Sequence, residues 1–90
     1  MIEVEYAEQF LKDTNKLKKS TYYLQIYKLC FEEIPNLDAI TSIKALKKLK
    51  GHKTFYRIRQ GELRIGIEII GSKIIFLRCL SRKDIYRYFP

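Results

Sequence analysis

The first half of the chain changes its hydrophobic period once, from two residues to the spacing of a helix. Residues 2–6 alternate apolar and polar side chains, which is typical of a short half-buried strand. Apolar side chains then recur at helical spacing and predict a first helix over residues 7–19 and a second over residues 21–34, which Pro35 ends. The second helix has a wide apolar face that we expect to be largely buried: Tyr23, Leu24, Ile26, Tyr27, Cys30, Phe31 and Ile34.

The second half is dominated by strand-like runs at residues 54–59, 62–70 and 73–80. Gln60-Gly61 and Gly71-Ser72 lie between these runs and favour tight hairpin turns. The preceding basic stretch is too short to assign, and the last residues predict one helical turn or a tail packed by its aromatics. Residues 1–90 therefore predict one small α+β domain. Its order is strand, helix, helix and three-stranded meander, with two helices on one face of an antiparallel sheet.

The alternation of the first hairpin places several arginines on one face. Side chains of a strand point alternately to its two sides, and the apolar residues of LRIGIEI must face the helices. Arg57, Arg59 and Arg64 then point the other way, with the ring of Phe55 on the same face. Gly66 is expected to leave an open spot beside them.

With the turn at Gln60-Gly61, the hairpin register pairs Arg59 with Glu62 and Arg57 with Arg64. Like charges directly opposite each other destabilise a sheet, so we expect an anion between them. A phosphodiester fits, because each guanidinium offers a planar pair of donors to phosphate oxygens. The alternative is an ordinary exposed sheet face whose charge is partly neutralised by acids on the same strands.

The distribution of charge supports a negatively charged partner. The net charge is +8, but residues 1–45 carry six lysines, no arginine and seven acids, whereas residues 46–90 carry six lysines, six arginines and three acids. Such an excess on one half of the chain is typical of proteins that bind a polyanion or an acidic protein. A basic surface that serves only solubility is the alternative.

The sequence has few groups for conventional acid–base or metal chemistry. His52, the only histidine, is expected to be a solvated loop residue between Lys50 and Lys53, two lysines that we place with Phe55 as RNA-binding candidates. Cys30 and Cys79 lie in apolar runs and are expected to be buried reduced thiols, with a disulfide as the alternative. No familiar metal or nucleotide motif is present, so we expect neither a metal nor a cofactor.

The sequence also predicts where the protein acts. The N-terminal residues lack the basic and apolar regions of a signal peptide. No segment approaches the roughly 20 apolar residues that span a bilayer. We therefore expect a soluble cytoplasmic protein with no membrane partner.

Residues 49–69 and 74–90 resemble the RelE/ParE superfamily of toxins from bacterial toxin–antitoxin pairs. The resemblance rests on the motifs LKG, YRIR, a GxxR hairpin and LRxxxRKDIYR. It implies a compact α+β toxin that a cognate antitoxin neutralises, in an assembly that can be a heterotetramer. For the RelE branch it also implies metal-independent cleavage of mRNA in the ribosomal A site, which blocks translation.

The resemblance carries the catalytic set onto Arg57, Arg59, Arg64, Arg82 and Tyr86. Arg57 and Arg64 would hold the scissile phosphate and stabilise the pentavalent transition state. Arg59 would orient the attacking 2′-hydroxyl, and Arg82 would assist the leaving 5′-oxygen. Tyr86 would orient the nucleotide, with its hydroxyl available for proton transfer; the alternative is an aromatic that merely packs.

The chain departs from many members of the superfamily at Ser81, where they carry a histidine, and at Ile67, where they carry a tyrosine. Two other functions stay open. A ParE-like toxin would bind and poison DNA gyrase without being an enzyme, and a basic RNA-binding domain would have no toxin role.

Overall fold

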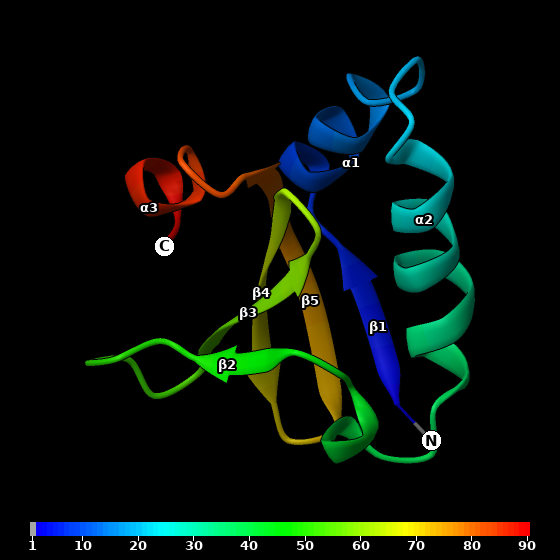
Figure 1. Cartoon of the computed structure of the whole chain (residues 1–90). Helices are drawn as coiled ribbons and strands as arrows, with labels where there is room; N and C mark the ends of the chain where they lie inside the picture. The colour runs from blue at the N-terminus through cyan, green and yellow to red at the C-terminus, as the bar shows by residue number, and fades with distance from the viewer. Residues whose placement is uncertain (1) are drawn as a thin grey trace.

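A computed structural model describes residues 2–90 as one mixed five-stranded sheet with helices on both faces (Figure 1). The strand order is β1-β5-β4-β3-β2. No helix among residues 2–90 has the length and apolar character that a membrane span requires. The elements are β1 Glu3–Tyr6, α1 Glu8–Asn15, α2 Tyr23–Tyr27, β2 Leu46–Lys48, β3 Phe55–Gln60, β4 Leu63–Ile70, β5 Lys73–Ser81 and α3 Ile85–Tyr88.

The expected meander is confirmed, because β3, β4 and β5 pair antiparallel in chain order. The expectation of a fully antiparallel sheet is wrong. The first strand, β1, pairs parallel with the last, β5, with Glu3 opposite Lys73 and Tyr6 opposite Phe76. This pairing joins residues from the two ends of the chain, so no local sequence pattern reports its direction.

The helices are shorter and less regular than their apolar spacing predicts. α1 ends at Asn15, and turns follow it as far as α2. α2 continues into wider π-helical turns at Lys28–Glu33 and a 3₁₀ turn at Ile34–Asn36. Pro35 thus lies inside the last turn of the helical segment rather than beyond its end.

Only one stripe of the second helical segment is buried. Ile26, Cys30 and Ile34 are at most 1% exposed and pack against the sheet, as expected. Leu24 is 61% exposed and Tyr27 is 40% exposed, so the prediction of a wide buried face is wrong for them. The physical reason is that a helix lying on a sheet contacts it along one side only.

β2 is an element that the sequence pattern did not predict. It has three residues and pairs antiparallel with β3, placing Leu46 opposite Ile58 and Lys47 opposite Arg57. Ala45, just before it, has the left-handed conformation (φ 58°), and its carbonyl accepts the Arg59 N–H at 3.2 Å. A left-handed alanine is sterically unfavourable, so this bend depends on its tertiary contacts.

The β3–β4 hairpin has the predicted faces but a different register. Gln60 pairs with Leu63, so the turn residues are Gly61 and Glu62 rather than Gln60-Gly61. Gly61 takes the left-handed conformation there (φ 58°), which glycine adopts without steric cost. The pairing differs by two positions from the prediction, and an even shift leaves every side chain on the same face.

A β-bulge on β5 reverses the alternation near the end of the sheet. Gly66 pairs with Arg78 and Ile67 pairs with Phe76, so Leu77 is the extra residue. Arg78 therefore faces the side of the sheet that Gly66 faces. Cys79, 3% exposed, joins the core on the opposite side, with Phe76.

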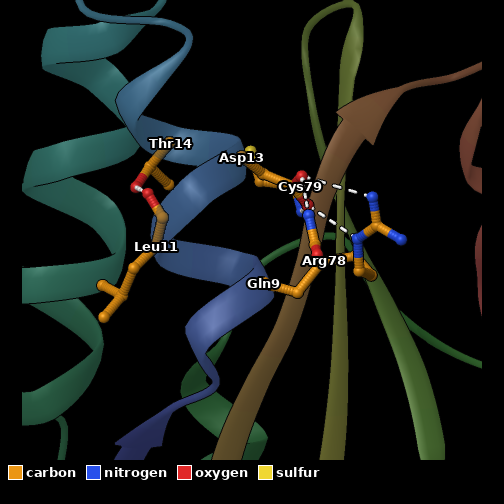
Figure 2. Close-up of polar contacts among 6 residues, drawn as sticks. All are labelled: Gln9, Leu11, Asp13, Thr14, Arg78 and Cys79. Carbon is orange, nitrogen blue, oxygen red and sulfur yellow. Dashed lines mark hydrogen bonds and ion pairs between the residues drawn. The ribbon is translucent and has the colours of Figure 1, made fainter.

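Asp13 of α1 binds the part of the β5 edge that β1 does not pair with (Figure 2). β1 pairs with β5 only as far as Phe76, and beyond that point the Asp13 carboxylate accepts the Cys79 N–H at 3.0 Å. The Arg78 guanidinium donates to the same carboxylate from Nε at 2.8 Å and from its terminal nitrogen at 3.2 Å. Asp13 is thus a buried charge whose acceptors are satisfied, as burial requires.

The two cysteines are buried and free, as expected. Burial, together with the nearby Asp13 charge, raises the pKa of Cys79 to about 12. Burial and the nearby Cys79 raise the pKa of Cys30 still further above its ordinary value. Both side chains therefore remain neutral thiols in the folded protein, which suits packing rather than nucleophilic chemistry.

Replacing Asp13 is expected to destabilise the fold, because the Cys79 N–H and the Arg78 guanidinium lose their acceptor together. Asp13→Ala should lower the free energy of unfolding by about 2–4 kcal/mol. Glu8→Ala removes an exposed carboxylate from the same helix and should change it by less than about 0.5 kcal/mol. Urea unfolding followed by circular dichroism measures both. Equal effects of the two substitutions would contradict the role of Asp13.

The buried thiols predict a loss of stability in alkaline solution. Above the ordinary thiol pKa of 9.0, the unfolded chain releases protons that the folded chain keeps until about pH 12. Unfolding is therefore favoured as the pH rises through this window. Urea titrations across it should show a falling free energy of unfolding, with a shallower slope for Cys30→Ala/Cys79→Ala. Parallel slopes would show that the thiols do not contribute.

Candidate active site

A hollow of about 460 Å³ opens on the sheet face opposite α1 and α2. The edge strand β2 and the C-terminal helix α3 border this face of the sheet (Figure 1). The hollow brings together four of the five catalytic candidates with residues that the sequence did not indicate. Its lining residues are Ala45, Leu46, Lys47, Arg57, Arg59, Arg64 and Tyr86.

The cations of the hollow form two cross-strand pairs of like charge. Lys47 lies opposite Arg57 across β2 and β3, and Arg59 lies opposite Arg64 across β3 and β4. The expected pairing of Arg57 with Arg64 is wrong, because the turn lies one residue further along the chain. The physical argument still applies and now involves a fourth cation, Lys47, which lies on the strand that the sequence pattern did not predict.

The two arginines of the second pair are held differently. One terminal nitrogen of Arg64 donates to the carbonyls of Gly61 at 2.8 Å and Leu63 at 2.9 Å, which orients the guanidinium against the turn. Arg59 is exposed and has no acidic side chain within 4.0 Å among residues 2–90. The predicted pairing of Arg59 with Glu62 is therefore wrong, since Glu62 lies in the turn. The Arg59 guanidinium is therefore available to bind an anionic ligand.

Tyr86 of α3 lines one side of the hollow. Tyr86 is 69% exposed, and the Arg57 guanidinium lies 4.6 Å from the centroid of its ring. α3 follows a turn in which the Ser81 hydroxyl accepts the Asp84 N–H at 3.2 Å. For the last residues the sequence predicts either one helical turn or a tail packed by its aromatic residues, and the structure shows both.

Arg82 and the two loop lysines are not among the lining residues. Arg82 Nε lies 3.4 Å from a Glu62 carboxylate oxygen, and the Arg82 N–H donates to the Glu62 carbonyl at 3.0 Å. Both side chains of this ion pair are more than half exposed, so the pair is weak and easily exchanged. Lys50 and Lys53 are exposed in the loop between β2 and β3, on either side of the exposed His52.

The open spot expected at Gly66 is filled. A Cβ at this position would lie 2.7–2.8 Å from three ring atoms of Phe89, so the ring lies directly on the glycine. Phe55 packs edge-on against Phe89, with ring centroids 5.7 Å apart, and against His52 at 5.5 Å. The prediction of an open spot is wrong because a residue from the end of the chain occupies it.

The hollow is suited to binding an anion. Its charges come from arginine and lysine, and no group of three metal-ligating side chains occurs among residues 2–90. An anion with several oxygens could accept from more than one guanidinium at once, as phosphodiesters do. The exposed tyrosine at its edge adds an aromatic face and a hydroxyl.

Toxin RelE3 of Methanocaldococcus jannaschii is 42% identical to this chain over 90 residues, covering 99% of this chain and 100% of the relative. The chain belongs to the RelE toxin family. A chain of the crystal structure of the RelB-RelE antitoxin-toxin complex from Methanococcus jannaschii superimposes with a TM-score of 0.75 and 41% identity, covering 96% of this chain and 99% of that one. No family model matches the sequence.

A more distant structure shows the same fold. A chain of the Escherichia coli DinJ-YafQ complex covers 100% of both chains with a TM-score of 0.70 and 17% identity. The arrangement of sheet and helices is thus kept where most side chains differ.

The two departures of this RelE-family chain from the superfamily pattern lie at different places. Ile67 is 0% exposed and faces the core, on the opposite side of the sheet from the hollow. Ser81 lies at the end of β5, and its hydroxyl is engaged in the turn before α3. The substitution at position 67 therefore removes no group from the hollow.

Neutralising one cation of the hollow should stabilise the free protein. Arg59→Gln relieves the repulsion with Arg64 and should raise the free energy of unfolding by about 0.2–1 kcal/mol. Added sulfate should raise the melting temperature of the unmodified protein more than that of the variant. Lys18→Gln, an exposed change outside the hollow, controls for net charge. A fall in stability on Arg59→Gln would contradict a repulsive pair.

Proposed function

We propose that this RelE-family chain is the toxin of a toxin–antitoxin pair and a metal-independent endoribonuclease that cleaves mRNA in the ribosomal A site. The observation that carries the proposal is the hollow in which Lys47, Arg57, Arg59 and Arg64 converge beside Tyr86. Four cations with two repulsive pairs stabilise neither strand nor hairpin, so their position is best accounted for by a phosphate between them.

The chemistry that suits this site is internal transesterification of RNA. The ribose 2′-oxygen loses its proton and attacks the adjacent phosphorus, while the bond to the 5′-oxygen of the next nucleotide breaks and that oxygen takes up a proton. The products are a 2′,3′-cyclic phosphate and a free 5′-hydroxyl. The nucleophile belongs to the substrate, so the protein needs chiefly to position the phosphate and stabilise its added negative charge.

The geometry of the hollow is compatible with the roles that the family resemblance implies. Arg64 is already oriented by the turn carbonyls and would donate to the phosphate together with Arg57. Arg59, which has no acidic side chain within 4.0 Å in the described part of the chain, would stabilise the 2′-oxygen as it loses its proton. Lys47, opposite Arg57, adds a fourth charge for the transition state.

Tyr86 and Arg82 border this arrangement. Tyr86 would orient the attacked nucleotide and offer its hydroxyl for proton transfer. Arg82 would exchange its weak ion pair with Glu62 for the leaving oxygen. Lys50, Lys53 and Phe55 lie in or beside the loop after β2 and would contact flanking RNA in the cytoplasm, where translated message is found.

We also propose a cognate antitoxin as a binding partner. The solved structures include a RelB-RelE antitoxin-toxin complex and a DinJ-YafQ complex. A partner that places carboxylates over the hollow would neutralise its cations and block access of a phosphate. The ParE-like alternative has less support, because the relatives that the chain matches carry RelE and YafQ names. A phosphate-binding site also suits RNA cleavage, whereas a protein that only binds gyrase does not require one.

Primer extension on a reporter mRNA tests this proposal in cells that briefly express the chain. We expect cuts within translated codons, and a loss of about 10²–10³-fold in cleavage for Arg64→Ala and Arg59→Ala. Arg87→Ala removes an exposed arginine outside the hollow and should cleave normally. Cleavage by the purified protein on programmed ribosomes should leave 2′,3′-cyclic phosphate ends.

Two results would contradict the endonuclease. Cleavage that Arg87→Ala abolishes as fully as Arg64→Ala would show that total charge matters rather than the hollow. Growth arrest with intact message, accompanied by gyrase-linked DNA breaks, would assign the chain to the ParE-like function.

A further inference from the structure

One row of residues crosses the sheet on the face that carries the hollow. Lys47, Arg57, Gly66 and Arg78 are successive cross-strand neighbours on β2, β3, β4 and β5. Three members carry long cationic side chains and the fourth has none. The row therefore has one gap, between Arg57 and Arg78, where another part of the chain can reach the sheet.

The C-terminal segment covers this row with its aromatic residues. The Phe89 ring lies on Gly66, the Tyr86 ring centroid lies 4.6 Å from the Arg57 guanidinium, and the Tyr88 ring centroid lies 5.9 Å from the Arg78 guanidinium. Phe89 is 7% exposed, whereas Tyr86 is 69% exposed. Of the rings on this segment, Phe89 is therefore the one that packs tightly against the sheet.

Glycine at position 66 is required by this contact and not by the backbone. Its φ lies outside the left-handed region, so other residues can adopt the conformation. Any side chain, however, would begin with a Cβ 2.7 Å from the Phe89 ring, which is closer than such atoms approach. The ring would have to shift away from its position on Gly66.

Leaving this position would also move Tyr86. Tyr86 lies in α3, and Phe89 is the C-cap residue of the same helix, with its N–H donating to the Ile85 carbonyl at 3.0 Å. Arg57 and Gly66 lie directly opposite each other on the sheet, so the two rings meet adjacent positions. Because Tyr86 itself is mostly exposed, contacts of its neighbours in the C-terminal segment hold it in place.

We infer that Gly66 and Phe89 are positioning residues that hold Tyr86 over Arg57 at the edge of the hollow. This inference rests on the proposed function for its catalytic consequence, but the seating of the tail is a property of the protein alone. Ile85 is fully buried and anchors the start of α3, while Phe89 on Gly66 sets the orientation of the turn that follows.

The seating is measured with a fluorescent probe that needs no activity. The chain contains no tryptophan, so Tyr86→Trp introduces a single indole at the position of interest. In this background Gly66→Ala should lower the anisotropy of the indole and increase its quenching by iodide. Ile74→Val, a buried change facing the helix side of the sheet, controls for a general loss of stability and should leave both signals unchanged.

The catalytic consequence is measured by cleavage kinetics on programmed ribosomes. Gly66→Ala and Phe89→Ala should each lower kcat by about 10–100-fold, as misplacement of a catalytic group does, with KM changed little. Phe89→Tyr keeps the ring and should retain activity. Adding Gly66→Ala to Tyr86→Ala should cause no further loss, since both changes remove the same contribution.

Three outcomes would overturn the inference. These are an unchanged indole signal in Gly66→Ala, a loss in the double variant that is the product of the single losses, or normal kcat in both Gly66→Ala and Phe89→Ala. If the unmodified protein cleaves no mRNA, the proposed function fails. The fluorescence measurement then still decides whether Phe89 on Gly66 holds position 86.

Discussion

The burial of one face of β3 and β4 against the helices is the constraint on which the rest of this structure depends. Isoleucines at positions 58, 65 and 67 are at most 1% exposed, and each sends its chain neighbour to the opposite face. Arg57, Arg59 and Arg64 are therefore outside because the isoleucines are inside. The site is a consequence of the core and is built on strands of the sheet, where charged groups can be held close together.

β5 joins this core to both the helices and the tail. Its bulge at Leu77 turns Arg78 toward the face opposite the helices, with Tyr88 from α3 near it, and Asp13 from α1 binds its guanidinium at the edge of β5. The same carboxylate accepts the Cys79 N–H, which β1 does not reach. One buried acid thus satisfies a strand edge and neutralises the arginine that the bulge exposes.

Charge repulsion in the hollow is a locally unfavourable feature of this structure, as is the left-handed backbone of Ala45. The pairs Lys47/Arg57 and Arg59/Arg64 oppose sheet stability, and Arg64 donates to the backbone carbonyls of Gly61 and Leu63. Such conflicts are expected where a protein binds a ligand, because the ligand supplies the missing opposite charge. The proposed phosphate between these cations gives the repulsion a function in catalysis.

The sequence by itself determined which side chains of β3 and β4 are buried, which arginines share a face and that the thiols are in the core, because these follow from periods of two and 3.6 residues. The tertiary structure alone decided the parallel β1–β5 pair, the strand that carries Lys47, the opposition of Arg59 to Arg64 and the Phe89 ring on Gly66. The reason is that a period assigns a residue to a face, whereas its neighbours across the sheet depend on turn geometry, a bulge and contacts between distant segments.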